Sequence, residues 1–133
     1  MKIVIMGCGR VGARIAGELE NEGHEVSVID YDDEAFLNLL PGFSGRTVVG
    51  NGVDKDVQRE AGAVGADIFM ALANGDNRNA AAAQVAKHIN GVPRVVARIF
   101  DPERAEVYRE LGVHAVNPTV VVTNLVRDAA FGP

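Results

Sequence analysis

This sequence has a single cysteine, no long apolar run and no residue spacing typical of a metal site. Cys8 is the one cysteine among 133 residues, so an intrachain disulfide is excluded and a reducing compartment, the cytoplasm, is expected. No apolar run approaches the roughly 20 residues that span a membrane, so direct membrane insertion is not expected. The amino terminus lacks the pattern of a signal peptide. No HxH, CxxC or HExxH spacing suggests a metal site.

Basic residues are also in the minority. Lys and Arg total 13 against 18 Asp and Glu, and the net charge of −5 argues against nucleic acid as a partner. The chain is 47% hydrophobic and long enough for one domain with a core of its own, 1–133, but short for a two-domain enzyme. The bulk properties therefore indicate a single cytoplasmic domain.

The amino-terminal stretch joins an expected strand to an expected helix through a glycine-rich turn. Residues 2–6 are mostly apolar, and the turn Gly7-Cys8-Gly9-Arg10-Val11-Gly12 follows at once. Helical spacing begins within the turn, with apolar groups at Val11, Ile15, Ala16 and Leu19. Gly7 would allow the tight turn, Gly9 would let a phosphate approach the backbone, and Gly12 would let the helix pack on the strand. The helix start favours an anionic phosphate, although glycine turns also serve purely structural ends.

A second expected strand supplies the other half of the nucleotide-binding pattern. Residues 25–29 read as a strand that ends on Asp30, 18 positions after Gly12. An acid at about this distance accepts hydrogen bonds from a ribose 2′-hydroxyl, and its charge disfavours the 2′-phosphate of NADP. The alternative is that Asp30 only caps the next helix, a role that Asp32 or Asp33 could also fill. Together the two halves favour nucleotide binding.

The rest of the chain alternates expected strands with expected helices. Further strands are predicted at 47–49, 68–72, 94–99 and 114–116, and helices at 34–40, 54–61, 80–89 and 102–111, with a last one from Thr119. This pattern predicts an α/β fold, a Rossmann-type doubly wound parallel sheet covered on both sides, with six strands in the order 3-2-1-4-5-6. Such sheets bind ligands where the strands end, here at Gly9, Asp30, 50–52, 73–74 and Arg98.

Two arginines and the cysteine lie near this edge, and each could take part in ligand binding or in redox chemistry. Arg10 could reach a phosphate from inside the glycine turn. Arg98 ends an apolar strand. We expect its guanidinium to pair with an anion, either the ligand or a carboxylate of another subunit, in preference to lying on a solvated rim. Cys8 could be a redox-sensitive thiol at a helix start, although small size in a crowded loop explains it equally well.

No catalytic constellation accompanies the nucleotide signal. A dehydrogenase needs a proton donor or acceptor near the nicotinamide. The three histidines, His24, His88 and His114, do not fall at the carboxyl ends of strands, so solvated or structural roles are expected for them.

The last predicted helix carries apolar residues around much of its circumference. From Thr119 on, polar side chains are few, and the apolar ones are Val120, Val121, Val122, Leu125, Val126, Ala129, Ala130 and Phe131. A terminal helix on a closed domain should show one apolar stripe. We therefore expect a partner subunit to bury it or a further domain to follow it, with a capping helix at the sheet edge as the plain alternative.

Taken together, these segments resemble the RCK or KTN (TrkA-N) regulatory domains of potassium channels and transporters. The glycine motif is common to many folds, but the later segments are more specific. The matching residues are 3–12, 23–30, 50–52, 66–67, 76–79, 96–98 and the Leu-Gly…Val-Asn-Pro ending at 111–118. The resemblance implies a cytoplasmic module that does not catalyse a reaction. It would lie at the inner face of the membrane through its transporter or channel, bind NAD(H), ATP, ADP or AMP, and form a homodimer or a higher ring.

The resemblance also assigns roles to residues of this chain. Phosphates would lie at the glycine turn, ribose at Asp30, adenine beside Asn51 and Gly52, and the helix at 119–131 would be the crossover helix that packs on a partner. The full set of implied cofactor-binding residues is Gly7, Cys8, Gly9, Arg10, Val11, Gly12, Asp30, Tyr31, Asn51, Gly52, Ala73, Asn74 and Arg98.

Two departures from the family pattern leave the nucleotide open. The family usually has Gly-Asp at 50–51 and Asp-Glu at 76–77, where this chain has Asn51 and Asn77. Asn51 can still donate to and accept from adenine, but it lacks the charge. A different class of function also stays open, namely the dinucleotide-binding domain of an NAD-dependent oxidoreductase cut from a larger chain.

Overall fold

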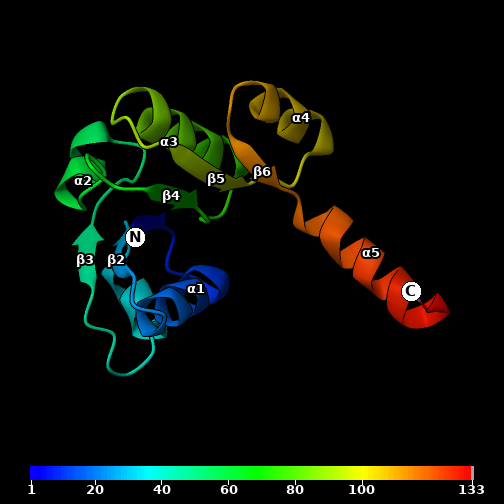
Figure 1. The fold of residues 1–133 in the computed structure, drawn as a ribbon, viewed down its shortest axis with the longest axis horizontal. Coiled ribbons are helices and arrows are strands. Elements are labelled where there is room, and N and C mark those ends of the chain that lie inside the picture. Colours follow the sequence, from blue (N-terminus) through cyan, green and yellow to red (C-terminus); the bar gives the residue numbers. More distant parts are fainter. Residues whose placement is uncertain (133) are drawn as a thin grey trace.

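Six parallel strands form one sheet in a computed structural model that describes residues 1–132 (Figure 1). The strand order is β3-β2-β1-β4-β5-β6, as the sequence predicts. The strands are β1 (Lys2–Met6), β2 (Glu25–Asp30), β3 (Arg46–Val49), β4 (Ile68–Ala71), β5 (Arg94–Arg98) and β6 (His114–Val116). The order reverses between β1 and β4, so the segments that follow these two strands turn to opposite faces of the sheet, which leaves the crevice where doubly wound sheets bind ligands.

Helices connect the strands, and polar side chains define where several of them begin. Asp54, Asp101 and Asn117 each accept hydrogen bonds from backbone N–H groups in the first turn that follows them. The helices are α1 (Arg10–Asn21), α2 (Lys55–Glu60), α3 (Asp76–His88), α4 (Pro102–Glu110) and α5 (Pro118–Phe131), with a 3₁₀ segment, η1 (Asp33–Asn38), after β2.

The predicted boundaries are wrong in two places. The helix expected at 80–89 begins a turn earlier, at Asp76, because polar residues that read as a loop make up its first turn. The helix expected at 34–40 is a 3₁₀ segment that ends at Asn38. Leu40, the last residue of the expected helix, is 51% exposed, because the chain has already left the helix at that point.

Helices cover the two faces of the sheet unequally, which corrects the expectation that both sides are covered. In Figure 1, α2, α3 and α4 lie above the sheet and α1 lies below it. Four of the five β1 residues and four of the six β2 residues are buried, so both faces are covered there. In β4, β5 and β6 the buried residues alternate with accessible ones. One face is therefore open, and its accessible side chains, which we call the open half-face, are Ile68, Met70, Arg94, Val96, Arg98, His114 and Val116.

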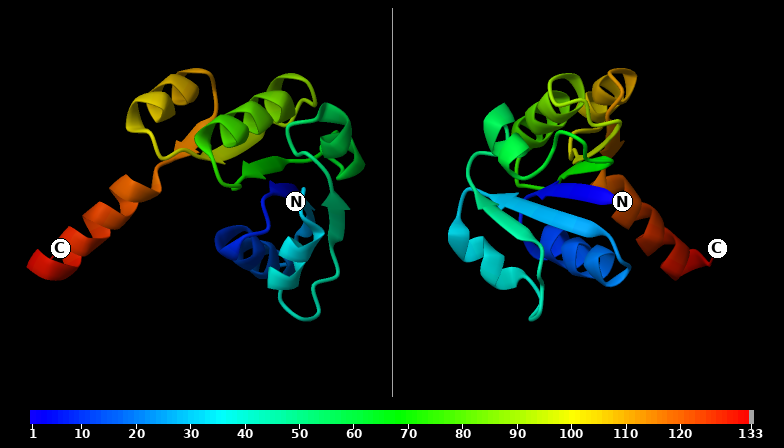
Figure 2. Two further views of the ribbon diagram at one scale, coloured as in Figure 1. Left: turned by 180° about the vertical axis from the view of Figure 1, so that it is seen from behind. Right: turned by 60° about the vertical axis from the view of Figure 1, so that its left-hand side comes forward.

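The last helix leads away from the rest of the domain. In Figures 1 and 2, α5 extends from the end of β6 and its carboxyl end lies far from the sheet. No residue of α5 is buried, and six large apolar side chains on it are between 47% and 83% exposed. Over residues 1–132, none of the helices has the length and apolar character that crossing a membrane requires.

Asn79, in the first turn of α3, ties the ends of two strands together. Its side chain is fully buried. Its Nδ2 donates to the carbonyl oxygens of Ala73 and Arg98 at 2.8 and 2.9 Å, and its Oδ1 accepts from the Ala73 N–H at 2.9 Å. These bonds fix the segments that follow β4 and β5 on one wall of the crevice.

Replacing this side chain should therefore cost stability. In Asn79→Ala we expect the free energy of unfolding to fall by about 2–3 kcal/mol, because buried backbone groups lose their partners. Urea unfolding followed by circular dichroism measures the change. Asn124→Ala, on the exposed α5, should stay within about 0.5 kcal/mol of the parent. Equal values for the two variants would contradict the role of Asn79.

Candidate functional site

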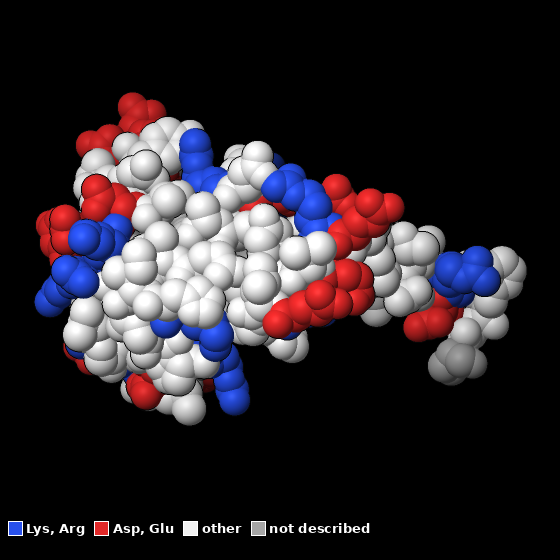
Figure 3. All heavy atoms as spheres, turned by 90° about the horizontal axis from the view of Figure 1, so that it is seen from above, with Lys and Arg blue, Asp and Glu red and all other residues white. Residues whose placement is uncertain are grey.

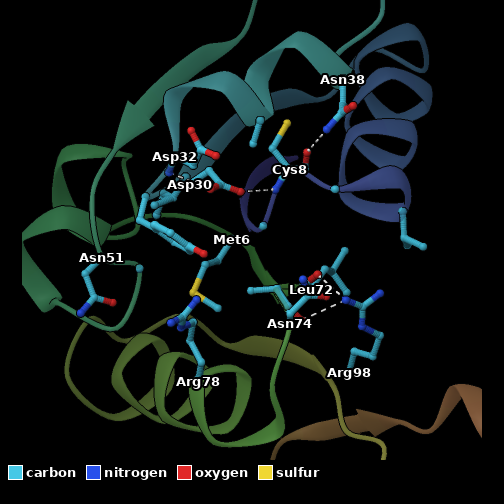
Figure 4. Close-up of a pocket in the computed structure, with 18 of the residues that line it drawn as sticks. Met6, Cys8, Asp30, Asp32, Asn38, Asn51, Leu72, Asn74, Arg78 and Arg98 are labelled. Atoms are coloured by element: carbon cyan, nitrogen blue, oxygen red, sulfur yellow. Dashed lines mark hydrogen bonds between the residues drawn. The ribbon is translucent and has the colours of Figure 1, made fainter.

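A cavity of about 540 Å³ opens at the carboxyl ends of the strands (Figure 4). Its walls come from the turn after β1, the ends of β2 and β5, and the loops after β3 and β4. Every implied cofactor-binding residue except Gly12 lines it. Residues far apart in the sequence thus meet at the edge where the strand order places them.

Two glycines of the turn are required by packing. Gly7 has a φ of +104°, and a Cβ there would lie 2.6 Å from the Ala73 nitrogen. At Gly12 a Cβ would collide with the Gly7 carbonyl oxygen. Gly12 therefore lies behind the cavity and acts through the approach of α1 to β1, so its implied place among ligand-contacting residues does not match the geometry.

Gly9 differs, because the space around it is open. A Cβ at this position would meet no atom within 4 Å, and its φ of −81° suits any residue. Gly9 is the residue before α1 and brings no side chain to the first turn. The first amides of a helix lack intrahelical partners, so those of α1 can donate toward the cavity beside the positive end of the helix dipole. This arrangement suits a phosphate.

Asp30 links the glycine turn to the end of β2. Its two carboxylate oxygens accept from the N–H groups of Cys8 and Asp32, each at 2.9 Å (Figure 4). Because a carboxylate offers about four lone-pair positions, both oxygens can still accept from a ligand hydroxyl. The alternative role of Asp30 as a helix cap is wrong, since Asp32 accepts from the Glu34 N–H at the start of η1.

The thiol of Cys8 is fully buried beside Asp30. Burial, and then the negative charge of Asp30, raise the pKa of Cys8 from 9.0 to about 11. A thiol that is buried and protonated at neutral pH is a poor nucleophile. Of the two interpretations of Cys8, the geometry therefore supports the small residue in a crowded turn.

Within this chain, Arg98 bonds to backbone carbonyl oxygens; the ligand or the carboxylate of another subunit, which the sequence predicts as its partner, stays a prediction. Its Nη2 donates to the carbonyl oxygens of Leu72 and Ala73 at 3.0 and 2.9 Å, and its guanidinium lies 5.6 Å from the Phe100 ring centroid. The Arg98 Nε is buried and has no hydrogen-bond partner among residues 1–132. The side chain lies where the cavity and the open half-face meet.

Sequence reasoning missed three polar side chains that line the cavity, those of Asp32, Asn38 and Arg78. Asp32 caps η1, and Asn38, at the end of η1, donates from Nδ2 to the Cys8 carbonyl oxygen at 3.0 Å. Arg78 points into the cavity from the first turn of α3, and its guanidinium lies 4.9 Å from the centroid of the Tyr31 ring (Figure 4). The late start predicted for α3 hid Arg78, because it placed this residue in a loop.

A buried amide network positions the loop after β3. Gln58 is fully buried and donates from Nε2 to the carbonyl oxygens of Gly52 and Ala82, at 2.8 and 3.0 Å. Its Oε1 accepts from Asn90 Nδ2 at 3.0 Å. In the loop itself, Asn51 Oδ1 accepts from the Val53 N–H at 3.1 Å. The Asn51 amide group is thereby oriented at the cavity rim, with Nδ2 left to donate.

Positive charge is concentrated in the cavity although the chain as a whole is acidic. Three guanidinium groups line it, those of Arg10, Arg78 and Arg98, against the carboxylates of Asp30 and Asp32. On the face that carries α2, α3 and α4, acidic and basic side chains are mixed around a broad uncharged area (Figure 3). The cavity therefore attracts an anion more strongly than the average surface of this acidic chain does.

Two carboxylates, those of Asp30 and Asp32, line the cavity, and no histidine of the described part of the chain does. Within residues 1–132, no three His, Cys, Asp or Glu side chains come together as metal ligands. The histidines lie elsewhere, as expected, and His24 Nδ1 is 3.1 Å from the amino-terminal nitrogen, at the opposite edge of the sheet.

Residues 3–118, most of the chain, match the TrkA-N domain. The chain belongs to the TrkA-N family. Among relatives, the Trk system potassium uptake protein TrkA of Streptomyces coelicolor is 51% identical over 96% of this chain and 56% of that protein. The chain thus spans about half the length of the curated relatives it matches first.

Solved structures share the fold of this TrkA-N chain at low sequence identity. The TrkA-N domain of the inner membrane protein YbaL from Escherichia coli superposes with a TM-score of 0.85, at 17% identity, over 96% of this chain and 95% of that one. The Kef CTD from Shewanella denitrificans, in an AMP-bound form, gives 0.79 at 23% identity, over 98% of this chain and 80% of that one. These matches confirm the Rossmann-type architecture.

The pKa of Cys8 predicts how stability depends on pH. In the unfolded chain the thiol ionises near pH 9, while the folded protein keeps it protonated until about pH 11. Its contribution to stability is therefore complete below pH 9 and is lost as the pH rises to 11. Urea unfolding between pH 8 and 11 should show a steeper loss in the parent protein than in Cys8→Ala. Parallel curves would contradict the raised pKa.

Proposed function

We propose that this chain is a nucleotide-binding regulatory domain of a potassium transporter or channel. The observation that carries the proposal is the cavity itself, where open helix amides, three arginines and Asp30 converge at the point where the strand order reverses. The 51% identical relative named as a potassium uptake protein supports the transport role. The domain would then act in the cytoplasm, at the inner face of the membrane through its transporter.

In this proposal the ligand is NAD(H) or an adenine nucleotide such as ATP, ADP or AMP. Its phosphates lie on the amides of α1 in the space beside Gly9, within reach of Arg10. The ribose hydroxyls donate to the free lone pairs of Asp30. Adenine lies by the loop that Gln58 holds, next to Asn51 and Gly52. The other contacts come from Gly7, Cys8, Val11, Tyr31, Ala73, Asn74 and Arg98.

We infer that the domain binds its ligand without transforming it. A dehydrogenase needs a group that donates or accepts a proton at the reacting carbon. Among the acidic groups of the cavity, Asp30 and Asp32 each accept from backbone amides, and the thiol of Cys8 is buried with a raised pKa, while no histidine among residues 1–132 lines it. Hydride transfer by this chain would favour the oxidoreductase alternative instead.

A second part of the proposal is a homodimer through α5. This helix is about 21 Å long, at 1.5 Å per residue, and exposes six large apolar side chains. The open half-face of the same chain has an apolar part, Ile68, Met70, Val96 and Val116, next to the polar side chains Arg94, Arg98 and His114. In a symmetric dimer each α5 would cover the open half-face of the other copy, which would bury both surfaces at once. Further pairing of such dimers would give a ring.

Regulation would follow from contacts between the cavity wall and the base of α5. Asn117 caps α5 and donates from Nδ2 to the Phe100 carbonyl oxygen at 3.1 Å. The Phe100 N–H in turn donates to Asp76 at the start of α3, at 2.8 Å. A ligand that binds one arrangement of these segments more tightly than another would shift the relative positions of the two subunits.

Nucleotide binding is tested by thermal unfolding with NAD⁺, NADH, ATP, ADP and AMP. A ligand at 100 times its dissociation constant should stabilise the fold by about 2.7 kcal/mol, a shift of several degrees. Gly9→Val should fold normally, since its side chain enters open space, but should lose the shift because it occupies the phosphate position. No shift with any nucleotide would sink the proposal. Absorbance at 340 nm with NADH and candidate substrates tests the enzyme alternative.

Dimerisation is tested by sedimentation of charge variants in α5. Leu125→Asp should raise the dimer dissociation constant by more than about a hundredfold, because each dimer loses two leucines worth about 1.5–3 kcal/mol each. Asn124→Asp adds the same charge next to it, on a polar position, and should leave the dimer intact. A parent protein that sediments as a 14.1 kDa monomer at all concentrations would overturn the proposed dimer.

A further inference from the structure

Arg78 and Tyr31 face each other across the mouth of the cavity from two distant segments. Tyr31 follows β2 and is 67% exposed, whereas Arg78 lies on α3, which follows β4. Because β1 lies between β2 and β4 in the sheet, this contact spans the crevice above the end of β1. Figure 4 shows Arg78 extended toward Met6, the last residue of that strand.

Among the described residues, the Tyr31 ring is what holds the guanidinium of Arg78 in this position. Among residues 1–132 it makes no hydrogen bond to a side chain or backbone and no ion pair, and its one recorded contact is with the Tyr31 ring. Exposed cation–π contacts are weak compared with charge-assisted hydrogen bonds. A ligand can therefore displace Arg78 from the ring at little cost.

The surroundings of Arg78 suit the base of a nucleotide better than its phosphates. A second cavity of about 460 Å³ adjoins the first and is lined by Tyr31, Asn51, Val53, Asn77 and Arg78. These groups are aromatic, apolar and amide-bearing, and Arg78 is the one cation among them. Asp76, in the first turn of α3, further disfavours a phosphate at that helix start. Flat rings stack on aromatic and guanidinium planes, and the Asn51 Nδ2 can donate to a ring nitrogen.

We propose that Tyr31 and Arg78 form a clamp that selects a purine base. The base stacks on Tyr31, and the Arg78 guanidinium moves from the tyrosine ring onto the opposite face of the base. This inference rests on the proposed nucleotide function and adds to it a specificity-determining residue, Arg78. The two fused rings of a purine overlap both planes more fully than a single-ring base does.

The chain offers a direct optical test of stacking on Tyr31. It contains no tryptophan and two tyrosines, and Tyr108 packs against the core on α4, away from the cavity. In Tyr108→Phe, Tyr31 is therefore the single fluorescent aromatic of this kind. AMP should quench its emission in a saturable way, whereas ribose 5-phosphate, which lacks the base, should bind without quenching. An unchanged emission at saturating AMP would overturn the clamp.

Affinities measured by calorimetry test the role of Arg78. In Arg78→Gln the dissociation constant for AMP should rise about tenfold while that for ribose 5-phosphate stays the same. Arg14→Gln is the matched control, since Arg14 lies on α1 beside Glu18 and outside the cavity, and it should change neither value. An equal loss for both ligands would show that Arg78 contacts phosphate and would overturn the clamp.

Failure of the clamp and failure of the proposed function give different results. If AMP binds the parent protein but neither Tyr31 emission nor the Arg78→Gln affinity changes, the clamp alone is wrong. If no nucleotide binds the parent protein, the proposed function is wrong and the clamp with it. The three substitutions used in these tests leave the buried core intact, so the variants should fold.

Discussion

The close approach of α1 to the ends of β1 and β4 is the constraint on which the site depends. Gly12 lies against the Gly7 carbonyl, and Gly7 lies against the backbone of Ala73, so neither position has space for a Cβ. This packing aims the open amides of α1 at the point where the strand order reverses. The glycines of the motif therefore differ in purpose: two of them fix the geometry, and Gly9 alone leaves room for a ligand.

Polar side chains then fix the positions of the other walls of the cavity relative to one another. Asp30 joins the glycine turn to the end of β2, Asn79 joins the ends of β4 and β5, and Gln58 holds the loop after β3. Asn79 and Gln58 are fully buried. The Asn79 amide bonds to the carbonyls of Ala73 and Arg98 at the ends of two strands, and the Gln58 amide joins the loop carbonyl of Gly52 to that of Ala82 in α3. A ligand site built in this way is rigid before any ligand arrives, which lowers the cost of binding.

The sequence predicts the strands well because their apolar runs and glycine boundaries are local signals. It also places nearly all of the cavity residues, since the carboxyl ends of parallel strands meet at one edge. It fails at the start of α3, where a polar first turn resembles a loop, and so it misses Arg78. Periodicity cannot reveal that Arg98 satisfies backbone carbonyls, nor that one face of β4 to β6 lacks a helix, because both depend on contacts between distant segments.

The uncovered side of the sheet gives a physical reason for the composition of α5. Right-handed crossovers from β1 to β3 and from β4 to β6 place their helices on opposite faces, so half of one face stays open in this topology. A chain can cover such a surface with an added helix of its own or with one from another copy. The helix α5 points away from its own sheet and is apolar over most of its surface. In a dimer, one interface would therefore bury both α5 and the open half-face of the second copy. Arg98 lies at the border between that surface and the cavity, so the proposed assembly and ligand binding would share one side chain.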